Sequence, residues 1–227
     1  MANFPITCVD NFYSNPDKVR EFALSLKYFK EENVIYPGER TEPIYLMDSD
    51  FFRLFSRKIF SLFFDLNFYD VRYSIQTAFQ KIYKYECSEN DFNEVNSGWV
   101  HDDDSTILAG VIYLNPSPNL DSGTSFYQSY RQEYSMRDTL KIRSDFYNHQ
   151  GLPSDEYASL KKIHHSQFYK VAEFNNVYNR MVAYDGTYLH RESSFVMDSE
   201  DFRLTQVFFV KDLEIPDKTQ TPIMRSK

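Results

Sequence analysis

The chain has 227 residues, of which 42% are hydrophobic and 18% aromatic, and its formal net charge is −8. This length and apolar content exclude a disordered chain and are typical of one domain with a substantial core. The acidic balance argues against a protein that binds nucleic-acid phosphates, and no apolar run is long enough to span a membrane.

Two cysteines, Cys8 and Cys87, are too few for a disulfide framework or a cysteine-rich zinc site. Residues 1–5 lack the charged segment that precedes the apolar part of a signal peptide. We therefore expect a cytoplasmic protein.

Two amphipathic helices are predicted within the first 70 residues. The first begins at residues 14–17, where a capping side chain, a proline in the first turn and an acidic residue coincide. Apolar residues then recur at helical spacing as far as Phe29. The second helix begins at residues 48–50 and carries apolar residues as far as Phe63, and residues 36–38 predict a loop between the two helices. We expect both helices to pack on one face of another layer.

From residue 72 the apolar period changes to two, which predicts strands. Tyr73, Ile75, Thr77 and Phe79 alternate with polar neighbours. Further strands are predicted at residues 98–101, 106–114, 123–127, 179–184 and 202–210. Helices followed by many strands indicate a mainly β fold with flanking helices.

We therefore expect a single domain over residues 1–227, in which residues 71–215 form a jelly roll, or double-stranded β-helix, and residues 1–70 buttress it. Residues 129–170 are polar, rich in tyrosine and ambiguous. A short helix is expected after Ser154, and the rest is expected to form a long loop or a lid that covers a substrate.

A candidate metal site begins in the sequence Trp-Val-His-Asp-Asp-Asp at residues 99–104. On an extended strand His101 and Asp103 share one face, whereas Asp102 points away, because side chains alternate. His190 is a third candidate ligand, at the end of a predicted turn. Two histidines and a carboxylate form the facial triad typical of non-haem Fe(II) oxygenases, which leaves coordination positions open for a keto acid and O₂.

His-x-Asp is a weak signal by itself, because the chain has 5 histidines and 33 acidic residues. A single histidine is more often a surface or hydrogen-bonded residue than a metal ligand. The neighbouring pair His164 and His165 is interpreted as a surface feature, because adjacent residues of a strand face opposite sides.

The order of the remaining motifs resembles the Fe(II)/2-oxoglutarate dioxygenase superfamily. The likeness covers residues 98–210 and is strongest to the prolyl-4-hydroxylase-like branch and its relatives from phages and marine bacteria. Its elements are His-x-Asp at residues 101–103, Tyr-Leu-Asn at 113–115, a glycine-containing turn at 122–126, His190 and Arg203. Ser122 departs from the branch, which usually has glycine there.

The resemblance implies that His101, Asp103 and His190 bind Fe(II). It also implies that Arg203 pairs with the far carboxylate of 2-oxoglutarate, which a planar guanidinium can hold through two hydrogen bonds. Tyr113 and Thr205 would donate hydroxyl groups to the same carboxylate. In such enzymes O₂ converts 2-oxoglutarate to succinate and CO₂ while a substrate is oxidised, and a carboxylate ligand in the triad favours hydroxylation over halogenation.

Arg203 and Tyr113 also have simpler, purely structural interpretations. Arg203 is also explained as an ordinary strand arginine paired with an acid, and Tyr113 as a core tyrosine. For the whole protein, one alternative is a cupin-type metal protein with other chemistry, which Arg203 disfavours. The other is a jelly-roll binding module without catalysis. The substrate expected for an oxygenase is a small molecule or a peptidyl group, and no oligomeric state is predicted.

Overall fold

The computed structural model describes residues 4–32, 34–65, 71–103, 105–130, 137–148 and 153–214. These residues form two antiparallel sheets. The large sheet has the order β1 (Thr7–Val9), β8 (Met181–Asp185), β5 (Leu108–Tyr113), β10 (Phe202–Glu214), β4 (Arg72–Tyr83), β3 (Glu39–Thr41) and β2 (Tyr28–Phe29). The small sheet has the order β7 (Phe168–Phe174), β6 (Thr124–Ser129) and β9 (His190–Glu192). The expected mainly β fold with flanking helices is confirmed at this level.

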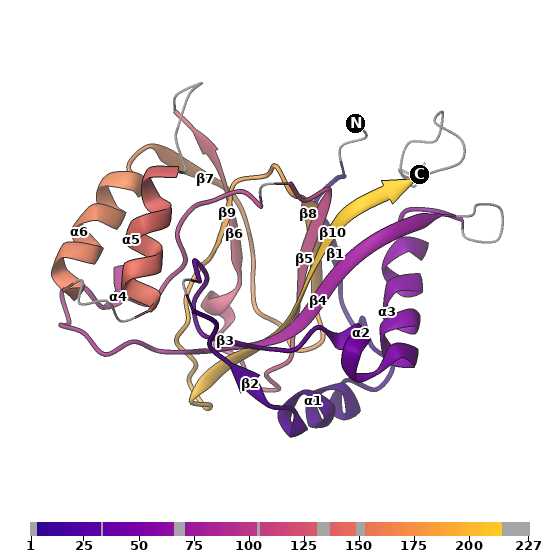
Figure 1. Cartoon of the computed structure of the whole chain (residues 1–227). Coiled ribbons are helices and arrows are strands. Elements are labelled where there is room, and N and C mark those ends of the chain that lie inside the picture. The colour runs from indigo at the N-terminus through magenta and orange to yellow at the C-terminus, as the bar shows by residue number, and fades with distance from the viewer. Residues whose placement is uncertain are drawn as a thin grey trace.

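The helices lie in two groups (Figure 1). One group lies beside the long strands β4 and β10 and contains α1 (Pro16–Ser25), α2 (Ile44–Met47) and α3 (Ser49–Ser61). The other gathers at the opposite end of the molecule and contains α4 (Phe92–Val95), α5 (Arg137–Tyr147) and α6 (Ser154–His165). A short 3₁₀ turn, η1 (Leu120–Ser122), precedes β6.

Both predicted helix starts are confirmed. The side chain of Asn15 accepts a hydrogen bond from the N–H of Lys18 over 3.2 Å at the start of α1. The side chain of Asp48 accepts one from the N–H of Phe51 over 2.8 Å at the start of α3. Each cap satisfies a backbone donor that the first turn of a helix leaves free.

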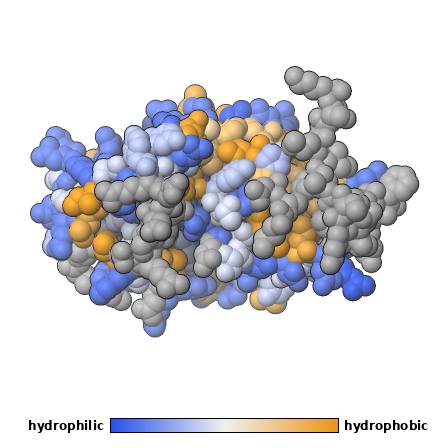
Figure 2. Space-filling model, turned by 90° about the horizontal axis from the view of Figure 1, so that it is seen from above, coloured by the Kyte–Doolittle hydropathy of each residue, from blue (hydrophilic) through white to orange (hydrophobic). Residues whose placement is uncertain are grey.

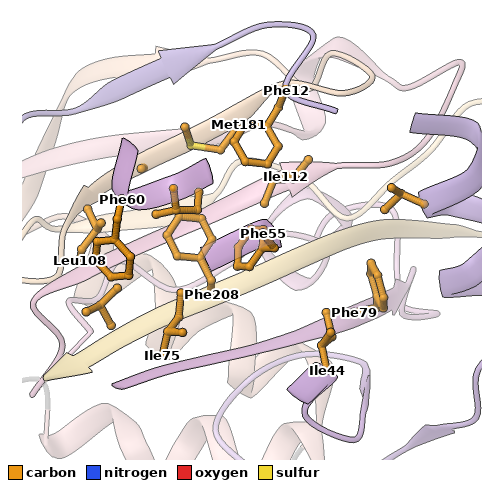
Figure 3. Close-up of a cluster of buried hydrophobic side chains, with 14 of the residues drawn as sticks. Phe12, Ile44, Phe55, Phe60, Ile75, Phe79, Leu108, Ile112, Met181 and Phe208 are labelled. Atoms are coloured by element: carbon orange, nitrogen blue, oxygen red, sulfur yellow. The ribbon is translucent and has the colours of Figure 1, made fainter. Parts of the chain in front are cut away.

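The main hydrophobic core lies between α1, α3 and one face of the large sheet. Figure 3 shows Phe55 beside Phe208 of β10 in this core, and the ring centre of Phe12 lies 6.3 Å from that of Phe55. Strand β5 is buried along its whole length because both of its faces are covered. Leu108 and Ile112 pack in the helix-facing core, whereas the alternate residues Ala109, Val111 and Tyr113 pack toward Phe126 of the small sheet. The space between the two sheets therefore begins at β5.

Most strand predictions are confirmed, since β4, β5, β6, β8 and β10 occupy the expected regions. The strand expected at residues 98–101 is wrong: within it, only His101 forms an isolated bridge, to His190. The strands β1, β2 and β3 were not predicted, because segments of two or three residues are too short to show a period. The helix expected after Ser154 is confirmed as α6, whereas α5 and the start of β7 occupy parts of residues 129–170 that were expected to be a loop. Residues 131–136 and 149–152 of this stretch lie outside the described residues.

Seen from above, hydrophilic and hydrophobic residues are interspersed over the surface, with the largest hydrophobic area near the middle (Figure 2). Within the described residues, none of the helices has both the length and the apolar content that a membrane span needs.

Candidate metal centre and its cavity

The side chains of His101, Asp103 and His190 converge on one point. One potential ligand atom from each lies within 4.8 Å of the others. Nε2 of His101 is 3.9 Å from Oδ1 of Asp103, and Nε2 of His190 is 3.5 Å from Oδ2 of the same carboxylate. The structure thus brings together all three residues predicted as metal ligands.

The two histidines are placed by backbone pairing. His101 donates its N–H to the carbonyl of His190 over 3.0 Å, and His190 donates back over 2.8 Å. Asp103 is placed by a turn instead, because its N–H donates to the carbonyl of Gly186 over 2.8 Å and its own carbonyl accepts the N–H of Thr106 over 3.0 Å. His101 and Asp103 therefore face the same point, as expected, although the segment between them is not a regular strand.

Both imidazole rings are oriented in the same way. Nδ1 of His101 lies 2.8 Å from the carbonyl of Trp99, and Nδ1 of His190 lies 2.8 Å from the carbonyl of Tyr188. A carbonyl only accepts hydrogen bonds, so each ring carries its proton on Nδ1 and turns the lone pair of Nε2 toward Asp103. Orientation of a ligating histidine through its second nitrogen is typical of metal sites.

Burial sets the protonation of the site. Burial lowers the pKa of His101 well below its ordinary value, and the nearby His190 and Arg143 act in the same direction. The His101 ring is therefore neutral, which is the form that binds metal ions. Burial also raises the pKa of Asp103, an effect that His190 and Arg40 oppose.

The surroundings of the Asp103 carboxylate indicate whether the site fits a metal ion. Its Oδ2 atom is buried and has no hydrogen-bond partner in the part of the chain that the structure describes. A buried carboxylate oxygen without a donor is costly unless a cation compensates it. Two imidazoles and one such carboxylate fit a divalent transition metal ion, with His101 and His190 as its nitrogen ligands.

The triad opens onto a cavity of about 780 Å³ that also contains Arg203. The Arg203 side chain is only 2% exposed. Its Nε donates to the carbonyl of Ser122 over 2.8 Å, and its guanidinium carbon lies 5.3 Å from the centre of the Tyr113 ring. Its Nη2 is buried without a partner among the described residues. This unpaired donor on a fixed guanidinium fits a carboxylate ligand.

Tyr113 and Thr205 lie beside Arg203 but behind the cavity wall. They are opposite each other in the pairing of β5 with β10. The Tyr113 hydroxyl lies 2.7 Å from Oγ1 of Thr124, which lines the cavity. Oγ1 of Thr205 is buried without a partner among the described residues. The structure therefore groups the three residues expected near 2-oxoglutarate, with Thr124 between Tyr113 and the cavity.

Sequence reasoning missed several residues that line the cavity, notably Arg40 of β3 and Arg143 of α5. Neither belongs to a recognisable motif, and both come from segments far from residues 99–104 in the chain. Only the fold brings them to the triad.

The expectation that His164 and His165 lie on the surface is wrong. They end helix α6 rather than a strand, and His164 is only 6% exposed. Nε2 of His164 lies 2.9 Å from the carbonyl of Val100, and Nε2 of His165 accepts the N–H of Val100 over 3.2 Å. The pair thus fixes both backbone groups of the residue that precedes His101.

Residues 2–210 match the model of a family described as a family of unknown function, DUF6445. No curated protein matches the sequence. Among solved structures, HygX from Streptomyces hygroscopicus with nickel and 2-oxoglutarate bound superposes with a TM-score of 0.51, at 10% identity, over 90% of this chain and 82% of HygX. HygX with iron bound gives a TM-score of 0.50 at 9% identity, over 90% of this chain and 81% of HygX.

A prolyl-4-hydroxylase from Pseudomonas putida gives a TM-score of 0.36 at 14% identity, over 90% of this chain and 85% of that one. This value is too low to show a shared fold. The likeness to HygX, which was solved with nickel and 2-oxoglutarate bound, shows a shared fold alone, and this fold agrees with the mainly β class expected from the sequence.

Proposed function

This chain belongs to the DUF6445 family, and we propose that it is an Fe(II)- and 2-oxoglutarate-dependent oxygenase. The observation that carries the proposal is the triad of His101, Asp103 and His190 in one cavity with the buried Arg203. Among the described residues, Oδ2 of Asp103, which would bind a metal, and Nη2 of Arg203, which would bind a diacid, have no hydrogen-bond partner. HygX was solved with iron bound and, separately, with nickel and 2-oxoglutarate bound. Its likeness to this chain supports the proposal only at the level of the fold.

The fold fits a double-stranded β-helix. From β7 to β10 the successive strands alternate between the small and the large sheet, and so do β5 and β6. Such alternation is how a chain winds a jelly roll. We therefore assign the two sheets to the two layers of a jelly roll.

Each residue has a physical task in this proposal. His101, Asp103 and His190 would bind Fe(II), which when loaded supplies, with O₂ and 2-oxoglutarate, the oxidation of a substrate C–H bond. Arg203 would hold the far carboxylate of 2-oxoglutarate with its free N–H groups, since Ser122 already fixes its Nε. The carboxylate of Asp103 is a full ligand, so we assign hydroxylation rather than halogenation to the site.

Two hydroxyl groups would complete the 2-oxoglutarate site. The side chain of Thr205 has a free oxygen two residues beyond Arg203 on the same strand. Tyr113 would act through Thr124, to which its hydroxyl is bonded. The two sheets and α5 around the cavity would keep bulk water away from the iron.

The first test is optical. Anaerobic addition of Fe(II) and 2-oxoglutarate should produce a weak visible charge-transfer band. His101→Ala and Asp103→Ala should abolish the band, because each removes a ligand, whereas Asp102→Ala serves as the matched control and should retain it. Arg203→Gln should still bind iron but weaken 2-oxoglutarate binding about tenfold or more, because a hydrogen-bonded charge is worth about 1.5–3 kcal/mol.

Two outcomes would contradict the proposal in different ways. Iron that binds without any response to 2-oxoglutarate would favour a cupin-type metal protein. A protein that binds neither would favour a jelly-roll module without catalysis.

A further inference from the structure

The cavity holds more positive charge than iron and 2-oxoglutarate require. Its lining includes five cationic side chains, Arg40, Arg143, Arg191, Arg203 and Lys211, and three carboxylates, Asp102, Asp103 and Glu192. With Arg203 and Asp103 assigned to the keto acid and the metal, four cations face two carboxylates. This excess is notable because the whole chain carries a net charge of −8.

Arg143 of α5 is the most unusual of these cations. It is only 6% exposed, and its Nε is buried with no hydrogen-bond partner in the described part of the chain. Among the described residues it forms no ion pair. Burying a cation with an unused donor is costly unless a ligand completes its contacts.

Arg40 of β3 repeats this pattern from another wall of the cavity. Its guanidinium carbon lies 3.6 Å from the centre of the Tyr36 ring and 5.5 Å from that of Phe209. Stacking on an aromatic face fixes the plane of a guanidinium and leaves its edge available for hydrogen bonds. Its Nε is buried and, like that of Arg143, lacks a partner among the described residues.

Arg40 and Arg143 lie in the same cavity as the triad. Both line the cavity that contains His101 and His190, and both lower the pKa of His101. Neither is needed by the 2-oxoglutarate site, where Arg203 is already held by Ser122. Two cations beside the triad, each with an Nε donor that lacks a partner in the described part of the chain, are suited to hold the anionic part of a second ligand.

We propose that Arg40 and Arg143 bind the anionic group, a carboxylate or a phosphate, of the molecule that this oxygenase oxidises. The inference rests on the proposed function for the reaction, whereas the anion site itself depends only on the two arginines. The rest of the substrate would lie among the apolar residues that share the cavity, such as Trp99, Leu140 and Phe209. A volume of about 780 Å³ is within the range of about 300–1,000 Å³ of small-molecule sites and exceeds the needs of a five-carbon keto acid alone.

The chain contains its own reporter for this site. Trp99 is the single tryptophan of the sequence and lines the cavity. Its fluorescence should change saturably when benzoate or phenyl phosphate is added to the anaerobic protein with Fe(II) and saturating 2-oxoglutarate. Benzamide, the neutral isostere of benzoate, should cause little change. A response to benzoate alone indicates a carboxylate substrate, one to phenyl phosphate alone indicates a phosphate, and a response to both supports the shared anion chemistry.

Substitutions test the assigned residues. Arg143→Gln and Arg40→Gln should each weaken anion binding about tenfold or more, and Arg143→Lys should weaken it less because it keeps the charge. Arg57→Gln is the matched control, since Arg57 is exposed on α3, and should bind like the wild type. Arg40→Gln, at a less buried position, keeps the test decisive if the circular dichroism of Arg143→Gln shows that it does not fold.

Several results would overturn the anion site. They are the absence of any anion response, equal binding of benzamide and benzoate, or wild-type binding by both glutamine variants. Loss of the response in Arg203→Gln but not in Arg143→Gln would place the probes in the keto-acid site and also overturn it. If no charge-transfer band forms but the anions still bind through Arg40 and Arg143, the oxygenase proposal fails while the anion site stands.

Discussion

His165 is a neutral ring held in a cationic environment. Burial lowers its pKa from the ordinary 6.5 to about 3, and Arg191 and Lys161 add to the effect, while Glu94 opposes it. Its Nε2 accepts the N–H of Val100, a bond that protonation of this nitrogen would break. The unprotonated ring therefore supports the segment that leads into His101.

This ring predicts acid sensitivity. As pH falls from 6.5 toward 3, His165 takes up a proton in the unfolded chain but not in the folded one, so stability falls with pH across this window. Between pH 7.5 and pH 5, urea unfolding should show the wild type losing about 2 kcal/mol more than His165→Asn, at about 1.4 kcal/mol per pH unit below 6.5. Equal losses in the two proteins would contradict the assignment.

Single residues were predictable from sequence where their partners are close in the chain. His101 and Asp103 could be found because they are two residues apart, and Arg203 because the resemblance gives its place in the motif order. Arg40 and Arg143 could not be found, because their unusual property is an Nε without a hydrogen-bond partner among the described residues, in a cavity that only the folded chain forms. The prediction for His164 and His165 was wrong because it assumed a strand, whereas these residues end a helix.

At the scale of elements, the turn after β8 is what positions Asp103. Asp185 accepts hydrogen bonds from the N–H and hydroxyl of Thr187 over 3.0 and 2.7 Å, which closes the turn. The carbonyl of Gly186 then binds the N–H of Asp103. A Cβ at Gly186 would lie 2.1 Å from the carbonyl oxygen of Thr106, so only glycine allows this approach.

Gly186→Ala should therefore push the turn away from residues 103–106. We expect a loss of about 1–3 kcal/mol in the free energy of unfolding, as for other overpacked sites, together with weaker Fe(II) binding. Thr187→Ala is the graded comparison: it removes one hydrogen bond of the turn but adds no atom near Thr106, so it should weaken both properties less than Gly186→Ala does. Calorimetric unfolding and Fe(II) titration measure the two effects, and unchanged iron affinity in Gly186→Ala would refute the positioning role of the turn.

The long elements were predictable because their apolar residues recur with a clear period, whereas the short elements have too few residues to show one. The apolar positions of β4 and the capped starts of α1 and α3 were visible in the sequence. The bridge from His101 to His190 is isolated, so His101 has no neighbouring strand residues and no apolar period from which the bridge could be predicted. Strand β3 exists because it pairs with the edge of β4, and β2 exists because it pairs with β3; both pairings depend on tertiary contacts.

In the molecule as a whole, the main hydrophobic core and the candidate metal site lie on opposite faces of the large sheet. The helix-facing core contains Phe55, which is 2% exposed and lies 5.6 Å from Phe208 between ring centres. The cavity lies on the other face, where Val207 and Phe209 of the same strand line it. Helix α6 adds a separate anchor through Lys161, whose ammonium group binds the carbonyls of Glu94 and Ser97.

Phe55→Ala should consequently weaken the fold without changing the chemistry of the site. We expect a loss of about 3–5 kcal/mol and a melting temperature lower by about 2–4 °C for each kcal/mol. Leu54→Ala, at a neighbouring position that is 60% exposed, should change stability by no more than about 0.5 kcal/mol. Thermal unfolding checks both values, and a change in the iron affinity of folded Phe55→Ala would contradict the separation.

The exchange of backbone hydrogen bonds between His101 and His190 has a consequence for how the protein matures. A ribosome-bound chain that has not yet extended past residue 190 has only part of the triad and no backbone partner for His101. For the proposed oxygenase, iron capture would then be a late event that follows synthesis of the final strands. Truncated translation products would bind the metal no better than an unstructured peptide.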